Sequence, residues 1–240
     1  MINFAHRGYS SKYPENTLLS FREAINIGAD AIELDVHKTK DNVLVVIHDE
    51  KVNRTHRGKG YVKDYTLKEL QRLKHRSIKY YFNKETEIPT LEEVLNLFKS
   101  NKMLINIEIK NDKINYKDIE QDVINMIKQY NMESRIILSS FNHNALIRCK
   151  EIDSTIQTGM LYSRPIKNIV EYAKRFKVDA LHPSALLVDE EYIKEAHKYN
   201  LKVNTYTVNV PEMMNMLISW NIDGIITDSP NELNKIIYRV

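Results

Sequence analysis

Short apolar segments alternate with amphipathic helical segments along almost the whole chain, and this alternation limits the fold more than any other feature. In the helical segments, apolar residues recur at helical spacing, as in Leu91, Val94 and Leu95. Eight segments resemble buried parallel strands, beginning near residues 3, 31, 104, 136, 156, 179, 203 and 224. Such a series in 240 residues predicts a TIM-type (β/α)8 barrel. An open doubly wound sheet is the alternative, but no glycine-rich loop supports a nucleotide-binding version of it.

One strand-like segment, 43–48, does not fit this parallel order. It follows the strand at 31–36 too closely for a parallel crossover, which needs a dozen residues or more. The residues between them have turn chemistry, so we expect an antiparallel hairpin. In that hairpin His48 lies opposite Leu34 and Asp35.

The segment 51–88 interrupts the alternation, and we interpret residues 1–240 as a single barrel domain with an insertion there. A helix is expected from residue 67 to about 76. Three consecutive aromatic residues follow at 80–82. We expect them to form the core of the insertion, although they could instead line an apolar entrance to the site.

The composition indicates a soluble globular protein, with 42% hydrophobic and 28% charged residues. The net charge of +3 is too balanced to indicate a nucleic-acid partner. Cys149 is the single cysteine, which excludes an intrachain disulfide, and we expect it to be buried. The sequence has neither a signal peptide nor an apolar run that could span a bilayer, so we expect a cytoplasmic protein. The oligomeric state is left open.

Two carboxylates, Glu33 and Asp35, alternate with apolar residues in the strand at 31–36, and Glu108 ends the next parallel strand. Buried carboxylates are costly unless they are paired, protonated or bound to a metal. Three oxygen ligands at one rim of a barrel favour Ca²⁺ or Mg²⁺ over zinc. The alternative is a buried ion-pair network with Lys110 or Arg7.

Two histidines, His6 and His48, end strands at the same rim. Two imidazoles can divide acid–base work, one removing a proton and the other protonating a leaving alkoxide. Arg7 and Lys110 supply positive charge suited to a phosphoryl group. His182, at another strand end, is a weaker candidate for substrate contact. We expect five further histidines to be solvated, namely His37, His56, His75, His143 and His197.

A series of short motifs runs in order from about residue 3 to about residue 232. It begins with AHRG at 5–8 and PENT at 14–17, and continues with ELDV at 33–36 and VIHD at 46–49. The later motifs are RT at 54–55, IPTLEEVL at 88–95, EIK at 108–110, SF at 140–141 and TD at 227–228. The ordered set resembles that of the glycerophosphodiester phosphodiesterases.

This resemblance implies a phospholipase-C-like barrel that uses a divalent cation to hydrolyse glycerophosphodiesters to glycerol 3-phosphate and an alcohol. By match of motif, it implies that the cation ligands are Glu33, Asp35 and Glu108. The same match makes His6 and His48 the acid–base pair, and gives phosphate binding to Arg7 and Lys110.

One position departs from the family pattern, because Tyr206 stands where tryptophan is common. Tyr206 could contact the glycerol or headgroup, or pack inside the barrel, so the headgroup preference stays open. Two other functions also stay open: a phosphodiesterase for lysophospholipids or phosphoinositides, and a barrel that binds phosphate esters without catalysis. The sequence does not separate attack by the glycerol hydroxyl, through a cyclic phosphate, from attack by water.

Overall fold

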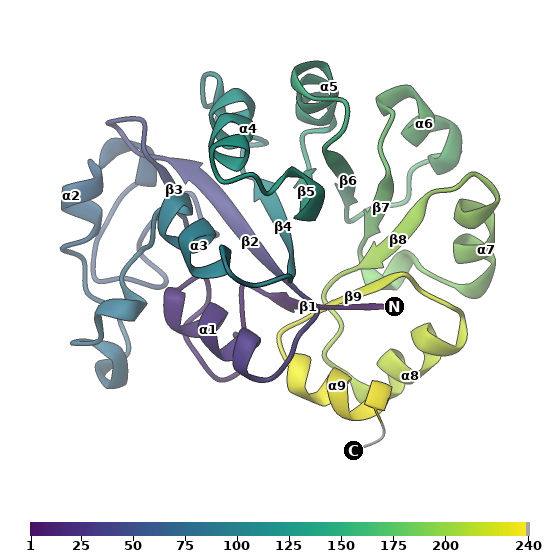
Figure 1. The fold of residues 1–240 in the computed structure, drawn as a ribbon, viewed down its shortest axis with the longest axis horizontal. Coiled ribbons are helices and arrows are strands. Elements are labelled where there is room, and N and C mark those ends of the chain that lie inside the picture. Colours follow the sequence, from purple (N-terminus) through teal and green to yellow (C-terminus); the bar gives the residue numbers. More distant parts are fainter. Residues whose placement is uncertain (239–240) are drawn as a thin grey trace.

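The computed structural model describes residues 1–238 and shows a closed barrel of parallel strands surrounded by helices (Figure 1). The barrel closes because β1 pairs in parallel with both β9 and β2. Its eight strands are β1 (Ile2–His6), β2 (Ala31–Lys38), β4 (Leu104–Ile109), β5 (Ile136–Ser140), β6 (Gln157–Tyr162), β7 (Ala180–Pro183), β8 (Lys202–Thr205) and β9 (Gly224–Thr227). The predicted TIM-type barrel is confirmed. Residues 239 and 240 of the interpreted domain lie outside the described part.

Helices cover the outside of the barrel (Figure 1). They are α1 (Leu18–Asn26), α3 (Leu91–Phe98), α4 (Ile119–Gln129), α5 (His143–Ile152), α6 (Ile169–Phe176), α7 (Glu190–Lys198), α8 (Pro211–Ser219) and α9 (Pro230–Tyr238). Thr17 and Thr90 begin α1 and α3 with capping boxes. Within residues 1–238, no helix is both long and apolar enough to cross a membrane.

The predicted hairpin is confirmed, with β3 (Leu44–Val46) antiparallel to the end of β2. β1 pairs with β2 only from Ala31 to Glu33, so the second half of β2 is free of β1 on that side. β3 occupies this edge, where Val36 pairs with Val46. The Ile47 amide then donates to the Asp35 carbonyl at 3.0 Å. The next residue, His48, is thereby placed at the carboxyl end of the barrel.

The segment 51–88 lies beside α1 and α3 at the left of Figure 1 and contains α2 (Leu67–Leu70). This helix ends earlier than the predicted residue 76. The segment has its own apolar core of Val52, Val62, Leu70 and Ile88, which also packs against the hairpin. The expectation that the aromatic residues 80–82 form that core is wrong, because the side chain of Phe82 is 89% exposed.

Candidate active site

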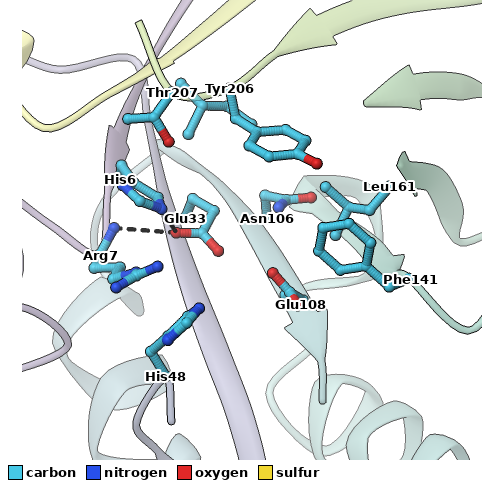
Figure 2. A pocket seen from close by; sticks show the side chains of 11 residues that line it. His6, Arg7, Glu33, His48, Asn106, Glu108, Phe141, Leu161, Tyr206 and Thr207 are labelled. Atoms are coloured by element: carbon cyan, nitrogen blue, oxygen red, sulfur yellow. Dashed lines mark hydrogen bonds and ion pairs between the residues drawn. The ribbon is translucent and has the colours of Figure 1, made fainter. Parts of the chain in front are cut away.

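A pocket of about 180 Å³ opens at the carboxyl ends of the barrel strands. Figure 2 shows side chains from both early and late strands turned toward this space. One side of it is polar and the other carries aromatic and aliphatic groups. The lining residues are His6, Arg7, Glu33, His48, Asn106, Glu108, Phe141, Leu161, Tyr206, Thr207 and Ile226.

Three carboxylates converge because of the register between β2 and β4, and two of them, Glu33 and Glu108, line the pocket. Asp35 is the direct neighbour of Glu108, and Glu33 lies two residues earlier on the same face of β2. One oxygen from each of the three side chains lies within 4.8 Å of the others. Glu33, Asp35 and Glu108 are only 4%, 0% and 7% exposed. Their negative charges are therefore concentrated in a region that is largely closed to water.

Two cations are held against these acids. The Lys110 Nζ lies 2.7 Å from Glu108 Oε1 and 3.8 Å from Asp35 Oδ1. The Arg7 Nε lies 3.4 Å from Asp35 Oδ2, and the Arg7 amide donates to Glu33 Oε2 at 3.1 Å. The hydrogen bond from the Arg7 backbone amide to Glu33 is the dashed line in Figure 2. Both cations thus lie beside the pocket in fixed positions.

The three carboxylates respond differently to this environment. Burial raises the pKa of Glu33, and the negative charges of Asp35 and Glu108 raise it further. Burial also raises the pKa of Glu108 to about 7, although Lys110 opposes the change. Burial acts in the same direction on Asp35, but Lys110 and Arg7 outweigh it and hold the pKa of Asp35 well below its usual value. Asp35 is therefore ionised, whereas the other two acids are disfavoured as anions.

The site is suited to a hard divalent cation. Asp35 Oδ1 is buried, and no hydrogen-bond donor reaches it from the described residues. Its other oxygen accepts a hydrogen bond from Asn16 Nδ2 at 2.8 Å, which fixes the carboxylate. The three carboxylates offer only oxygen atoms as ligands, and one of these atoms accepts no hydrogen bond. Such a group of ligands matches Ca²⁺ or Mg²⁺ coordination. Glu33, Asp35 and Glu108 could hold such an ion together.

The tight turn after β1 places Arg7 over this site. Arg7 has φ of 56°, in the left-handed region that is uncommon outside glycine. Gly8 follows with φ of 80°, and a Cβ there would lie 2.4 Å from Ser20 Oγ on α1. A glycine is therefore required for the turn to pack against α1 while it directs the Arg7 amide to Glu33.

Each of the two rim histidines is bound through Nδ1 to a carboxylate. His6 Nδ1 lies 2.6 Å from Asp228 Oδ1, and His48 Nδ1 lies 2.7 Å from Asp49 Oδ1. This arrangement leaves the Nε2 atoms free, and that of His6 lies 3.9 Å from Glu33 Oε2. Burial lowers the pKa of His48, and the charges of Lys110 and Arg7 lower it further.

Sequence reasoning missed several side chains that hold these groups. Asp49 accepts from Arg54 Nε at 2.8 Å, and Arg54 also contacts Glu15 at 2.6 and 2.7 Å. Glu15 in turn accepts from Arg7 at 2.9 Å. Asp228 accepts from Ser10 and Asn209 at 3.0 and 2.6 Å besides its contact with His6. Glu15, Asp49, Arg54 and Asp228 belong to the motifs PENT, VIHD, RT and TD. Their place in these motifs was the sequence signal that could have identified them as part of the site.

Tyr206 lies on the less polar side of the pocket (Figure 2). Its ring packs edge-on against Phe141, with centroids 6.1 Å apart. Its hydroxyl is buried and makes no hydrogen bond within residues 1–238. The ring therefore packs in the barrel mouth, which agrees with the packing option from the sequence, and contact with a substrate stays a prediction.

Several expectations for the remaining histidines are wrong. His37 and His56 are buried, not solvated, and burial lowers the pKa of each to about 4. His37 is buried because β2 extends to Lys38, and its Nε2 bonds the His48 carbonyl at 3.1 Å. His143 is half-buried and bonds the Leu161 carbonyl.

His182, expected to be a weak candidate for substrate contact, is enclosed in the barrel. Its Nε2 lies 3.0 Å from Asn204 Nδ2. It is fully buried and does not line the pocket. Cys149 is also buried, as expected, and burial raises the pKa of its thiol to about 12.

Comparison with known proteins agrees with this geometry. Residues 6–232 match the model of the glycerophosphoryl diester phosphodiesterase family. A glycerophosphodiester phosphodiesterase of Caldanaerobacter subterraneus subsp. tengcongensis is 42% identical, with 98% of this chain and 97% of that protein aligned. One from Bacillus altitudinis is 39% identical, covering 97% and 96% of the two chains. An Oleispira antarctica phosphodiesterase, solved with the product sn-glycerol-3-phosphate, is 26% identical, with a TM-score of 0.90 and coverage of 98% and 96%. The chain therefore belongs to the glycerophosphoryl diester phosphodiesterase family.

Proposed function

We propose that the protein hydrolyses glycerophosphodiesters to glycerol 3-phosphate and an alcohol, and that it depends on Ca²⁺ or Mg²⁺. The observation that carries the proposal is the pocket itself, where three buried carboxylates and two carboxylate-bound histidines meet. The Oleispira antarctica relative, solved with sn-glycerol-3-phosphate, supports glycerol 3-phosphate as the product. We treat residues 1–240 as one catalytic domain in which 51–88 is an insertion.

In this proposal Glu33, Asp35 and Glu108 hold the cation. When bound there, a divalent cation supplies positive charge that stabilises a negatively charged phosphodiester. Arg7, which lines the pocket, and Lys110, which is paired with Glu108, bind the phosphoryl oxygens. Both cations are already fixed by ion pairs, so little side-chain reorganisation accompanies substrate binding.

The two histidines transfer the protons. The lowered pKa of His48 keeps it neutral near pH 7, which is the form that accepts a proton. We therefore assign His48 as the base that activates the attacking hydroxyl or water. His6, paired with the anionic Asp228, then acts as the acid that protonates the departing alcohol. Tyr206 contacts the substrate through its free hydroxyl.

A small polar substrate suits this pocket better than a long acyl chain. The volume of about 180 Å³ is below the usual range of roughly 300 to 1,000 Å³ for drug-sized ligands. A glycerophosphodiester with a short headgroup is therefore preferred over a lysophospholipid. The set of charged groups also supports catalysis over simple phosphate-ester binding, since both proton-transfer groups are present.

The test is hydrolysis of glycerophosphoethanolamine with Ca²⁺, with Mg²⁺ and with a chelator, followed by enzymatic detection of glycerol 3-phosphate. We expect activity only with a cation, and severe loss in His6→Ala and in His48→Ala. His197→Ala is the control, because His197 contacts Asp223 on the outside of the barrel. Full activity in chelator would refute the cation dependence. Wild-type rates in both active-site variants would refute the acid–base assignment.

A further inference from the structure

A short segment of the insertion, residues 72–84, presents large apolar side chains to solvent. Ile78 is 81% exposed and Phe82 is 89% exposed. The backbone is nevertheless ordered by successive turns, since the amides of Tyr80, Tyr81 and Asn83 bond carbonyls three residues earlier. Ile78 begins these turns and Phe82 lies near their end, so both exposed apolar side chains belong to one short ordered segment. We call residues 72–84 the basic turn.

The basic turn is strongly cationic. It contains Arg72, Lys74, Arg76, Lys79 and Lys84, and no acidic residue occurs between Glu69 and Glu85. Lys74 is paired with Glu87, and the adjacent Glu85 is paired with Arg22 of α1. Among residues 1–238, no carboxylate lies within salt-bridge distance of the other four cations. The segment that carries Ile78 and Phe82 therefore contains four cations without a carboxylate partner among the described residues.

A second part of the insertion adds to this charge. The Arg57 guanidinium lies over the Tyr81 ring, 5.1 Å from its centroid, and donates to the Arg76 carbonyl. The Tyr81 and Phe82 rings pack edge-on with centroids 4.8 Å apart. Phe82 therefore packs against Tyr81, which Arg57 contacts in turn, while most of the Phe82 side chain stays exposed.

The basic turn also adjoins the rim that carries the pocket. The Tyr80 hydroxyl donates to the Lys12 carbonyl at 3.3 Å, in the loop that follows β1 and Arg7. Figure 1 shows the insertion beside α1, which starts from the same loop. A surface that engaged the basic turn would therefore lie next to the entrance of the pocket.

We propose that the basic turn docks the protein on an anionic lipid surface. Exposed aliphatic and aromatic side chains in a segment rich in Lys and Arg are typical of segments that enter the headgroup–acyl boundary of bilayers. Lys and Arg near such a surface are attracted by anionic lipids. A nucleic acid would use the cations but would give Ile78 no apolar environment. The inference concerns binding, so it does not depend on the proposed catalytic function.

The first experiment is cosedimentation of the whole protein with vesicles of phosphatidylcholine that contain or lack phosphatidylglycerol. We expect binding only to the anionic vesicles, weakening as salt screens the charges. Lys79→Gln and Lys84→Gln should each lower the affinity about fivefold, and Ile78→Ser with Phe82→Ser should abolish partitioning. Circular dichroism of each variant serves as the check on its folding.

Two matched controls locate the surface. Leu186 is also 89% exposed, but it follows β7, which stands opposite β2 in the ring of strands. Lys102 and Lys202 are exposed at the amino ends of β4 and β8, away from the pocket rim. Leu186→Ser and the Lys102→Gln, Lys202→Gln double variant should bind vesicles as the wild type does. Equal losses in these controls would overturn the assignment.

A Phe82→Trp variant tests entry into the bilayer directly. We expect a blue shift of its fluorescence on anionic vesicles and quenching by brominated lipid, measured against the single native tryptophan, Trp220, which follows α8 as its C-cap. Sedimentation without either change would refute insertion of Phe82. If the protein bound a DNA oligonucleotide and did not bind anionic vesicles, the ligand of the basic turn would be nucleic acid, and the proposal would be refuted.

Discussion

Asp228→Asn should lower kcat/KM for glycerophosphoethanolamine about 10- to 150-fold, because it removes a charged hydrogen bond worth about 1.5 to 3 kcal/mol. The oxygen of Asp228 lies 2.6 Å from His6 Nδ1. Although burial opposes ionisation, the hydrogen bonds from His6, Asn209 and Ser10 hold the pKa of Asp228 at about 2. Asp228 is therefore an anion throughout the working pH range, and it stabilises the imidazolium form that the proposed acid requires.

An amide at position 228 cannot replace this anion. Asn209 Nδ2 donates to the second oxygen of Asp228 at 2.6 Å, so the new NH₂ group faces a donor either there or at His6. The imidazolium of His6 then has no anionic partner in either orientation. We expect the loss to be mainly in kcat, because protonation of the departing alcohol belongs to the chemical step.

The assay is steady-state release of glycerol 3-phosphate from pH 5 to 9, with the melting temperature of each variant measured in parallel. Asp223→Asn is the matched control, because Asp223 also binds a histidine, His197 at 2.7 Å, but on the outside of the barrel. Its activity should be unchanged. Wild-type kinetics in Asp228→Asn would refute the reasoning, as would an equal loss in Asp223→Asn.

Three further predictions concern stability and reactivity. Ca²⁺ or Mg²⁺ at 100 times its Kd should stabilise the wild type by about 2.7 kcal/mol in thermal unfolding. Glu33→Gln should be more stable than the wild type in chelator, and it should lose most of the stabilisation by the cation. Full stabilisation of this variant by the cation would contradict the assignment of Glu33 as a ligand. Burial lowers the pKa of His182 to about 3, so the unfolded chain binds more protons as pH falls below about 6.5 and the folded state loses stability. In urea titrations, His182→Gln should reduce the stability lost between pH 7 and 5 by about 2 kcal/mol, and an unchanged loss would show that another group is responsible. The Cys149 thiol, whose pKa burial raises to about 12, should react with a thiol reagent only after unfolding, and rapid labelling of the folded protein would disprove its enclosure.

The barrel and the acid cluster follow from local patterns in the sequence. Strand alternation places Glu33 and Asp35 on one face, and the parallel order of strands brings Glu108 to the same rim. The hairpin places His48 by turn length alone. These inferences succeed because each depends on residues that are close in sequence or on a regular repeat.

Other parts of the site depend on long-range closure, which local patterns do not specify. His6 and Asp228 are 222 residues apart, and they meet only because Ala5 pairs with Thr227 where β1 joins β9. The contact of Glu15 with Arg54 depends on how the insertion folds back on the β1 loop. The prediction that Phe82 is buried failed for a different reason. Apolar character alone predicts burial, and it does not distinguish an apolar residue that stays on the surface.

The charge balance of the acid cluster connects stability with the proposed cation. Three buried carboxylates lie close to two fixed cations, Arg7 and Lys110, so the group carries excess negative charge when all three acids are ionised. Burial is the main cause of the raised pKa values of Glu33 and Glu108, and the charge of Asp35 adds to it, so ionising all three acids costs free energy. Selection for stability alone would favour an apolar residue or an amide at one of these positions. Because a divalent cation would offset the same repulsion, the destabilising feature of the free protein is also the source of its expected affinity for the ion.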